Sequence, residues 1–318
     1  MKTANTLPTT LQEAVSYFSE PDYTFDFAVA MRWPNGKIEC PRCGSEENSF
    51  LSTRRIWYCK GCKKQFTVKV GTIFEDSPLG MDKWMIAVWL IVTCKNGISS
   101  YEVAKGIGIT QKSAWHMMHR IRKAMQDGSF KKMRGEVEAD ETFIGGKARN
   151  MHPEKRKRRI TGRGTVDKTI VMGVLERGGE IRTAVVDNRR KKTLQAEIKK
   201  HVQAGAALYT DELKSYSGLA KEYAHEVINH AVSYVEDRVH TNGMENFWSL
   251  LKRGIGGTYV SVEPFHLFRY LDEQAFRFNN RKATDLERFM LAMENVWGKR
   301  VTWSELTGKD ARQETSIN

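Results

Sequence analysis

The fold of the larger domain is decided by the stretch Val137-Glu138-Ala139-Asp140-Glu141-Thr142-Phe143-Ile144, which Gly145-Gly146 follows. This stretch is predicted to be a β-strand that carries acids. Side chains alternate between the two faces of a strand, so Glu138 and Asp140 share one face and Glu141 lies on the other. The alternation leaves open whether Asp140 or Glu141 takes part in chemistry.

Strand-like and helix-like segments alternate from Gly135 onward. We expect strands at residues 136–144, 168–175, 181–186, 207–209 and 226–228. We expect helices at residues 192–203, 215–223, 244–253 and 264–279. Three strands, a helix, a strand, a helix, a strand and a helix follow one another in a ribonuclease H-like α/β domain.

Two further segments place acids where chemistry can use them. One is a short apolar strand that ends in acids, Ala206-Ala207-Leu208-Tyr209-Thr210-Asp211-Glu212. The other opens a later helix, His240-Thr241-Asn242-Gly243-Met244-Glu245-Asn246-Phe247-Trp248. Acids from two strands and a helix can converge on Mg²⁺, which prefers oxygen ligands, and two such ions can promote phosphodiester chemistry. The alternative for Asp140 and Asp211 is a solvated acid at a strand end.

The later helix also carries a lysine on the face of its acid. Glu245 and Lys252 are two turns apart, which places them on one face at a separation of about 10 Å. Lys252 can then meet a DNA phosphate beside the metal site, although a surface lysine is the alternative. Trp248 is expected in the core rather than stacked on a base.

Four of the five cysteines form two close pairs upstream of this domain. Cys40-Pro41-Arg42-Cys43 is followed, after fifteen residues, by Cys59-Lys60-Gly61-Cys62. This spacing is typical of a four-thiolate structural Zn²⁺ site, and two unrelated dithiol pairs or a redox pair are the alternative. Basic residues surround the cysteines and suit either phosphate contacts or a solvated face. Cys94 lies in an apolar segment and is expected to be a buried small residue.

A helix-turn-helix pattern follows the cysteine module. Ser99 and Thr110 can cap two helices that are separated by Gly106-Ile107-Gly108-Ile109. The second helix is expected to present Lys123 outward, together with the candidate DNA-reading residues Gln111, Lys112, His116 and Arg120. An ordinary helical hairpin is the alternative. His116 and His119 are expected to be helix-surface or core residues rather than metal ligands.

The composition narrows the class of protein. The 318 residues include 51 Lys and Arg against 38 Asp and Glu, a net charge of +13, and nucleic acid is the usual partner of such a basic chain. A basic soluble protein without that partner is equally compatible with the charge. The longest apolar run, residues 84–94, is too short to span a bilayer, and no apolar signal core opens the sequence.

These motifs together resemble bacterial insertion-sequence transposases that combine a zinc ribbon with a DDE-type domain. The resemblance is to the insertion-sequence 1595 family, which is related to the Merlin elements of eukaryotes. It covers nearly the whole chain, beginning with Arg32-Trp33-Pro34-Asn35-Gly36 and the first cysteine pair. It continues with Glu138-Ala139-Asp140-Glu141-Thr142-Phe143-Ile144-Gly145-Gly146, Tyr209-Thr210-Asp211, residues 240–253, Gly257-Thr258-Tyr259 and Phe278-Asn279-Asn280-Arg281.

The resemblance implies a set of catalytic residues. It assigns Asp140 rather than Glu141 as the first acid, Asp211 as the second and Lys252 as their lysine partner. Its third position varies between an acid and an asparagine, so Glu245 is favoured over the adjacent Asn246. These three acids are expected to bind Mg²⁺ or Mn²⁺.

The resulting prediction is an α+β multidomain transposase. We expect a helical lead at residues 1–35, a zinc ribbon at 36–75, a helix-turn-helix module at 76–130, a ribonuclease H-like catalytic domain at 131–300 and a tail at 301–318. The enzyme is expected to bind double-stranded DNA at terminal inverted repeats, cut the element ends and join the 3′ hydroxyl to target DNA. A basic run is expected to clamp this DNA or, alternatively, to form a solvated loop: Lys155, Arg156, Lys157, Arg158 and Arg159.

The resemblance further implies a homo-oligomer on DNA and a cytoplasmic, nucleoid-associated protein. Two other functions remain open. The first is a zinc-ribbon and helix-turn-helix regulator whose C-terminal domain is only structural. The second is a nuclease or recombinase on the same fold that performs no strand transfer, which only a joined DNA product distinguishes from a transposase.

Overall fold

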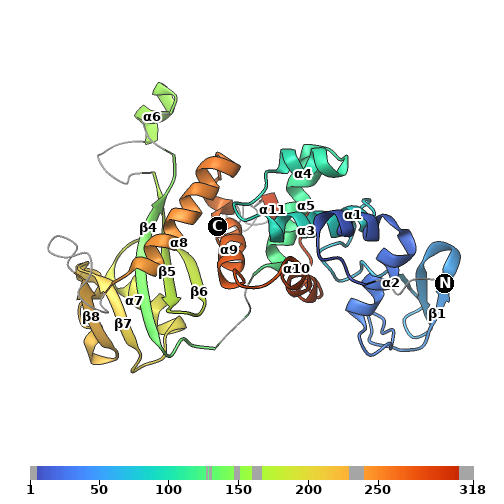
Figure 1. The fold of residues 1–318 in the computed structure, drawn as a ribbon, viewed down its shortest axis with the longest axis horizontal. Helices are drawn as coiled ribbons and strands as arrows, with labels where there is room; N and C mark the ends of the chain where they lie inside the picture. Colours follow the sequence, from blue (N-terminus) through green and yellow to red (C-terminus); the bar gives the residue numbers. More distant parts are fainter. Residues whose placement is uncertain are drawn as a thin grey trace, which may run out of the picture. The chain divides into compact units, whose positions relative to one another are not determined.

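The chain folds as two compact units in the computed structural model, which describes residues 6–126, 128, 131–146, 151–159, 167–228 and 240–307. Residues 1–126 and 282–318 form one unit, here called the ribbon unit. Residues 127–281 form the other, here called the sheet unit. Figure 1 shows the helices and strands of both. No helix among the described residues is long and apolar enough to cross a membrane.

The sheet unit is built on five strands in the order β6-β5-β4-β7-β8. The first three strands along the chain pair antiparallel, and the last two run parallel to β4. Their bounds are β4 (Glu136–Ile144), β5 (Thr169–Glu176), β6 (Ile181–Val186), β7 (Ala207–Asp211) and β8 (Ala224–Ile228). Three antiparallel strands followed by two parallel ones agree with the strand order expected from the sequence, and β4 lies at the centre.

Helices cover both faces of this sheet. Leu194 and Ile198 of α7 (Lys191–His201) share one buried cluster with Val137 and Ala139 of β4. On the opposite face, α8 (Asn242–Arg253) and α9 (Leu267–Asn279) pack over the sheet, and a second buried cluster contains Met244. The two faces of β4 therefore meet different helices. α8 continues into the π-helix η5 (Gly254–Tyr259), and the 3₁₀ helix η6 (Pro264–His266) leads into α9.

One predicted helix of the sheet unit is wrong. Residues 215–223 form two separate 3₁₀ helices, η3 (Lys214–Tyr216) and η4 (Leu219–Lys221). Gly218 between them has φ +89°, a left-handed conformation that interrupts a helix. The basic run after β4 forms a short helix, α6 (Pro153–Arg159).

The ribbon unit combines a small sheet with a set of helices. The sheet is antiparallel in the order β1-β2-β3. Its strands are β1 (Asn48–Leu51), β2 (Ile56–Cys59) and β3 (Gln65–Phe66), with the 3₁₀ helix η1 (Ser52–Arg54) between the first two. The helices are α1 (Leu11–Ser19), α2 (Pro21–Arg32), α3 (Met81–Thr93), α4 (Ser100–Ile107), α5 (Gln111–Ala124), α10 (Asp285–Glu294) and α11 (Trp303–Thr307).

The C-terminal boundary of the predicted catalytic domain is wrong, because residues 282–300 fold with the ribbon unit instead. The cause is the buried ring of Phe289 on α10. It lies 5.5 Å from the ring of Phe18, 5.8 Å from Phe27 and 5.2 Å from Trp89. Chain that follows the sheet unit therefore returns to complete the aromatic core of the first 126 residues.

Two capped helices occur where the sequence predicted a helix-turn-helix. Ser99 makes a capping box with Glu102 at the start of α4, and the hydroxyl of Thr110 accepts the N–H of Ser113 at the start of α5. Gly108 ends α4 with φ +64°. Beyond these caps the expectation for α5 is only partly met, because most of its side chains are buried and Lys112 alone among its described side chains is exposed.

Arg120 is the clearest departure from the predicted outward face. Its side chain is only 5% exposed. Nε and Nη2 donate to the carbonyl oxygen of Val301 at 3.2 and 3.0 Å, and Nη1 donates to that of Glu75 at 2.8 Å. Arg120 thus ties α5 to two distant segments, and the prediction that it faces outward is wrong.

Replacing Arg120 should destabilise the ribbon unit. Arg120→Met removes the donors to two carbonyl oxygens and is expected to lower the free energy of unfolding by about 2–3 kcal/mol. Urea denaturation followed by tryptophan fluorescence measures this change. Lys105→Met on the exposed side of α4 is the matched control and should change the value by less than about 0.5 kcal/mol. Equal effects of the two substitutions would contradict a structural role for Arg120.

Candidate functional site

The three predicted acids lie on three neighbouring elements of the sheet unit. Asp140 is on β4, Asp211 ends β7, and Glu245 is in the first turn of α8. β4 and β7 are paired in parallel, with Glu138 opposite Tyr209. Asp140 and Asp211 each follow that pair by two residues, so register places the two carboxylates side by side on adjacent strands.

Asp140 accepts hydrogen bonds from its own strand and from α8. Its Oδ1 accepts the backbone N–H of Glu141 at 2.8 Å, and its Oδ2 accepts the indole N–H of Trp248 at 2.9 Å. Burial, followed by the charges of Glu141 and Asp211, raises the pKa of Asp140 to about 7, although these two hydrogen bonds act in the opposite direction. A cation beside the Asp140 carboxylate would offset the cost of burial and the repulsion from the neighbouring acids. The carboxylate oxygens of this site are ligands that suit Mg²⁺ or Mn²⁺.

Glu141 points away from Asp140, as the alternation of the strand predicts. The Tyr216 hydroxyl donates to Glu141 Oε2 at 2.6 Å, and Arg189 Nη1 lies 3.6 Å from Oε1. Burial raises the pKa of Glu141, while the hydrogen bond from Tyr216 lowers it. Its carboxylate therefore has a hydroxyl and a cationic partner on the α7 side of the sheet. Asp140, on the α8 side, accepts only from an indole and a backbone amide.

Glu245, Asn246 and Lys252 are all exposed on α8. The three acids do not close into one tight group. Among the described residues, the only group of three or more side chains that could hold a metal ion is that of the four cysteines, whose sulfur atoms lie within 4.8 Å of one another. The structure thus places Asp140 beside Asp211 and leaves Glu245 on the adjoining helix, and it does not choose between Glu245 and Asn246.

The four cysteines converge at one end of the small sheet. Cys40 Sγ lies 3.7 Å from Cys62 Sγ, and Cys43 Sγ lies 3.5 Å from Cys59 Sγ. Gly44, with φ +73°, closes the turn after the first pair. Four sulfur atoms at this separation can bind one Zn²⁺ in a closed tetrahedral site, which is structural rather than catalytic.

The candidate DNA-reading residues of α5 are engaged within the ribbon unit. Gln111 Nε2 donates to Ser100 Oγ at 2.9 Å. The ring of His116 lies 5.4 Å from that of Trp303, and the Lys112 ammonium lies 5.4 Å from the same ring. Trp303 belongs to the C-terminal segment, which therefore covers part of the face that was expected to read DNA.

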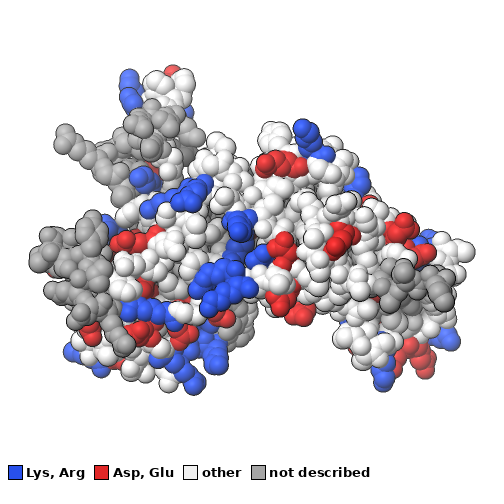
Figure 2. All heavy atoms as spheres, in the orientation of Figure 1, with Lys and Arg blue, Asp and Glu red and all other residues white. Residues whose placement is uncertain are grey.

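The basic helix α6 offers exposed charge. Arg156, Lys157 and Arg158 are exposed, whereas the side chains of Lys155 and Arg159 lie outside the described residues. Figure 2 shows further Lys and Arg side chains on the visible face of the sheet unit, with acidic side chains among them. Such a surface can bind phosphates.

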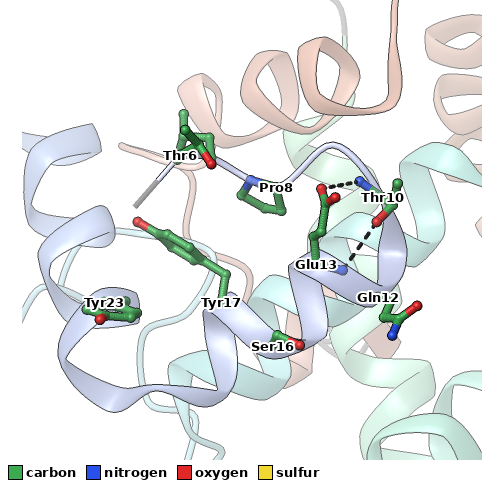
Figure 3. A pocket seen from close by; sticks show the side chains of 9 residues that line it. Thr6, Pro8, Thr10, Gln12, Glu13, Ser16, Tyr17 and Tyr23 are labelled. Atoms are coloured by element: carbon green, nitrogen blue, oxygen red, sulfur yellow. Dashed lines mark hydrogen bonds between the residues drawn. The ribbon is translucent and has the colours of Figure 1, made fainter. Parts of the chain in front are cut away.

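Two cavities lie in the ribbon unit, and neither contains a predicted catalytic acid. The first, of about 560 Å³, is lined by Tyr17 and Tyr23, and its Glu13 carboxylate accepts the backbone N–H of Thr10 (Figure 3). The same carboxylate also accepts from Thr9. The second, of about 680 Å³, is lined by residues of α2, by residues 67–70 that follow β3 and by the start of α3. The acids instead belong to the sheet unit.

Sequence reasoning missed the residues that support the acids. Glu138 was placed on the face of Asp140, but its contacts with Arg177 and with the backbone of α8 were not expected. Trp248 was expected in the core, where it lies at 4% exposure, but its hydrogen bond to Asp140 was not anticipated. The available signal was an acid and a tryptophan at positions that face the interior.

Comparison with known proteins finds a family match in each unit. The model of the ISXO2-like transposase domain matches residues 132–279, and that of the transposase zinc-ribbon domain matches residues 22–65. A protein of Halobacterium salinarum, named "Uncharacterized protein in transposable element ISH50", is 28% identical over 270 residues, which cover 80% of this chain and 90% of that protein. The first match coincides with the five-stranded sheet and the second contains all four cysteines.

The cysteine cluster should hold one zinc ion per chain. Cys59→Ser removes a ligand and is expected to reduce bound zinc to near zero and to unfold the small sheet, because metal binding and folding of such modules are coupled. Metal analysis and circular dichroism measure the two effects. Cys94→Ser, outside the cluster, is the control and should retain full zinc. Zinc retained by Cys59→Ser would contradict the four-thiolate assignment.

Proposed function

Since this chain belongs with the transposases of the insertion-sequence 1595 family, whose catalytic and zinc-ribbon domains it carries, we propose that it cuts DNA at the ends of its element and joins the freed 3′ hydroxyl to target DNA. The observation that carries the proposal is that Asp140 and Asp211 each lie two residues beyond the Glu138–Tyr209 pair of two adjacent parallel strands, beside α8. Asp211 adds to the burial that raises the pKa of the half-buried Asp140 carboxylate, a cost that a purely structural domain does not need.

Asp140, Asp211 and Glu245 are the proposed ligands of Mg²⁺ or Mn²⁺. Bound divalent cations supply an activated water or hydroxyl nucleophile and stabilise the leaving oxygen. The chain itself fixes the geometry: Trp248 holds one oxygen of Asp140, and the N–H of Leu213 donates to Asp211 Oδ1 at 3.1 Å. Each aspartate keeps lone pairs for a cation while its orientation is set.

Lys252 has the proposed role of a phosphate contact. It is exposed on α8, seven residues after Glu245 and thus on the same face of the helix. A separation of about 10 Å along the axis suits a lysine that binds a DNA phosphate next to the metal-binding acids. Its charge would position the strand that is cut.

DNA recognition is assigned to the zinc ribbon, the α4–α5 module and α6. Lys112 and the exposed side chains of α6 remain the candidate contacts of the described chain, together with Gln111 and His116. Terminal repeats and target DNA are the proposed partners. A homo-oligomer that pairs two DNA ends, in the cytoplasm at the nucleoid, completes the proposal.

A cleavage and joining assay tests the proposed reaction. DNA that carries the gene and both flanks is incubated with the protein in Mg²⁺, in Mn²⁺ and in EDTA. Metal-dependent nicks at the element ends and joined products are expected from the wild type. Asp211→Asn should lower both by at least about 100-fold, while Glu212→Gln, its exposed neighbour, should retain activity.

The outcomes separate the candidate functions. Cleavage without joined products would indicate a nuclease. Binding of the ends without any cut, by protein with verified zinc and fold, would indicate a regulator and overturn the proposal. A comparison of Glu245→Gln with Asn246→Ala identifies the third residue, and we expect Glu245→Gln to cause the loss.

A further inference from the structure

Glu138 is a buried carboxylate that the reaction does not use directly. Its side chain is 1% exposed on β4, two residues before Asp140. Oε2 accepts the backbone N–H of Met244 at 2.9 Å, and Oε1 accepts Arg177 Nε–H at 2.9 Å. Both oxygens are therefore occupied by protein donors, which separates Glu138 from the acids proposed to bind metal.

The Met244 contact lies at the start of α8. Thr241, the N-cap residue of this helix, makes no side-chain cap hydrogen bond. The first N–H groups of a helix lack partners inside it and carry partial positive charge. A carboxylate from the central strand takes the place of the missing cap. Gly243 makes room for it, since a Cβ there would lie 2.8 Å from Glu138 Oε2.

Arg177 extends the contact to the other elements of the site. Its Nη2 donates to the carbonyl oxygen of His240 at 2.6 Å, just before α8. Its guanidinium lies 4.2 Å from the ring centre of Tyr209 on β7, two residues before Asp211. The ion pair of Glu138 and Arg177 thus touches β4, β7 and the start of α8, the three elements that carry the proposed acids.

A second tie joins β4 to α8 in the same register. Trp248 donates to Asp140 just as Met244 donates to Glu138. On the helix Trp248 follows Met244 by four residues, and on the strand Asp140 follows Glu138 by two. Four helical residues rise about 6 Å, and two strand residues rise about 6.6 Å. The two spacings match, so both hydrogen bonds form together. Gly173 of β5 pairs with Asp140 of β4. A Cβ at Gly173 would lie 2.9 Å from the Trp248 ring, so the glycine makes room for the indole.

We infer that Glu138 is a positioning residue that sets α8 on β4, and thereby places Glu245 and orients Asp140 through Trp248. The inference rests on the proposed function and deepens it. Residues that orient metal ligands from behind typically contribute 10–100-fold to metal affinity or activity. Loss of the Glu138 cap frees the first turn of α8, which carries Glu245, while the candidate DNA contacts outside α8, Lys112 and the exposed side chains of α6, keep their places.

The test compares Glu138→Gln with a matched control. Glu176→Gln also removes a backbone-binding carboxylate, since Glu176 accepts the N–H groups of Arg134 and Gly135 at 2.9 Å, but its contacts do not reach α8. Two equilibrium measurements are made on the full chain: Mn²⁺ affinity by electron paramagnetic resonance, and the indole N–H resonance of Trp248, assigned with Trp248→Phe. Cleavage of end DNA is measured as separate kcat and KM values.

Glu138→Gln is expected to weaken Mn²⁺ binding and to lower kcat by about 10–100-fold, with the KM for DNA unchanged. The Trp248 resonance should shift, and Glu176→Gln should leave all three readouts as in the wild type. Wild-type Mn²⁺ affinity and an unshifted Trp248 resonance in Glu138→Gln would overturn the inference. If wild-type protein binds Mn²⁺ but cuts no DNA, the proposed function fails, and the two equilibrium readouts still decide the role of Glu138.

Discussion

The sheet unit depends on how the central strand β4 accommodates acids on both of its faces. Burying a carboxylate is costly unless hydrogen bonds or an opposite charge compensate it. Glu138 receives Arg177 and a helix N-terminus, and Glu141 receives Tyr216 and Arg189. Arg177 follows β5 and Arg189 precedes α7, whereas the other two partners are the start of α8 and Tyr216 of η3. Glu138 and Glu141 therefore restrict which segments can pack against β4.

The core of the ribbon unit depends on residues near the C-terminal end of the sequence. Phe289 of α10 fills the aromatic space among α1, α2 and α3, and Arg120 binds the carbonyl oxygen of Val301. The residues that complete the ribbon unit therefore follow the sheet unit in the sequence. The C-terminal segment also explains why the side chains of α5 are less exposed than those of a helix that reads DNA. Its Trp303 contacts Lys112 and His116.

Local patterns predicted what depends on neighbouring residues. The bounds of β4 and β6 agree with the expected ranges, and both capped helices begin at the predicted serine and threonine. Period-two alternation correctly separated Asp140 from Glu141. The failures share a different cause: Arg120 is bound by a segment 181 residues away, and α10 is drawn to the ribbon unit by aromatic contacts that no local pattern reports.

The hydrogen bonds that position the acids of the site could not be predicted from the sequence for the same reason. Trp248 and Asp140 are 108 residues apart, and Met244 and Glu138 are 106 apart, so only the folded sheet shows that they meet. Once the fold is known, the contrast among Glu138, Asp140 and Glu141, three of the four acids of β4, becomes informative. Glu138 and Glu141 are paired with a positive group, whereas Asp140, held by neutral donors beside another acid, has its pKa raised to about 7. β4 thus gives two of these acids a cationic partner and the third only neutral donors, so the unbalanced negative charge lies at Asp140, where a cation can offset it.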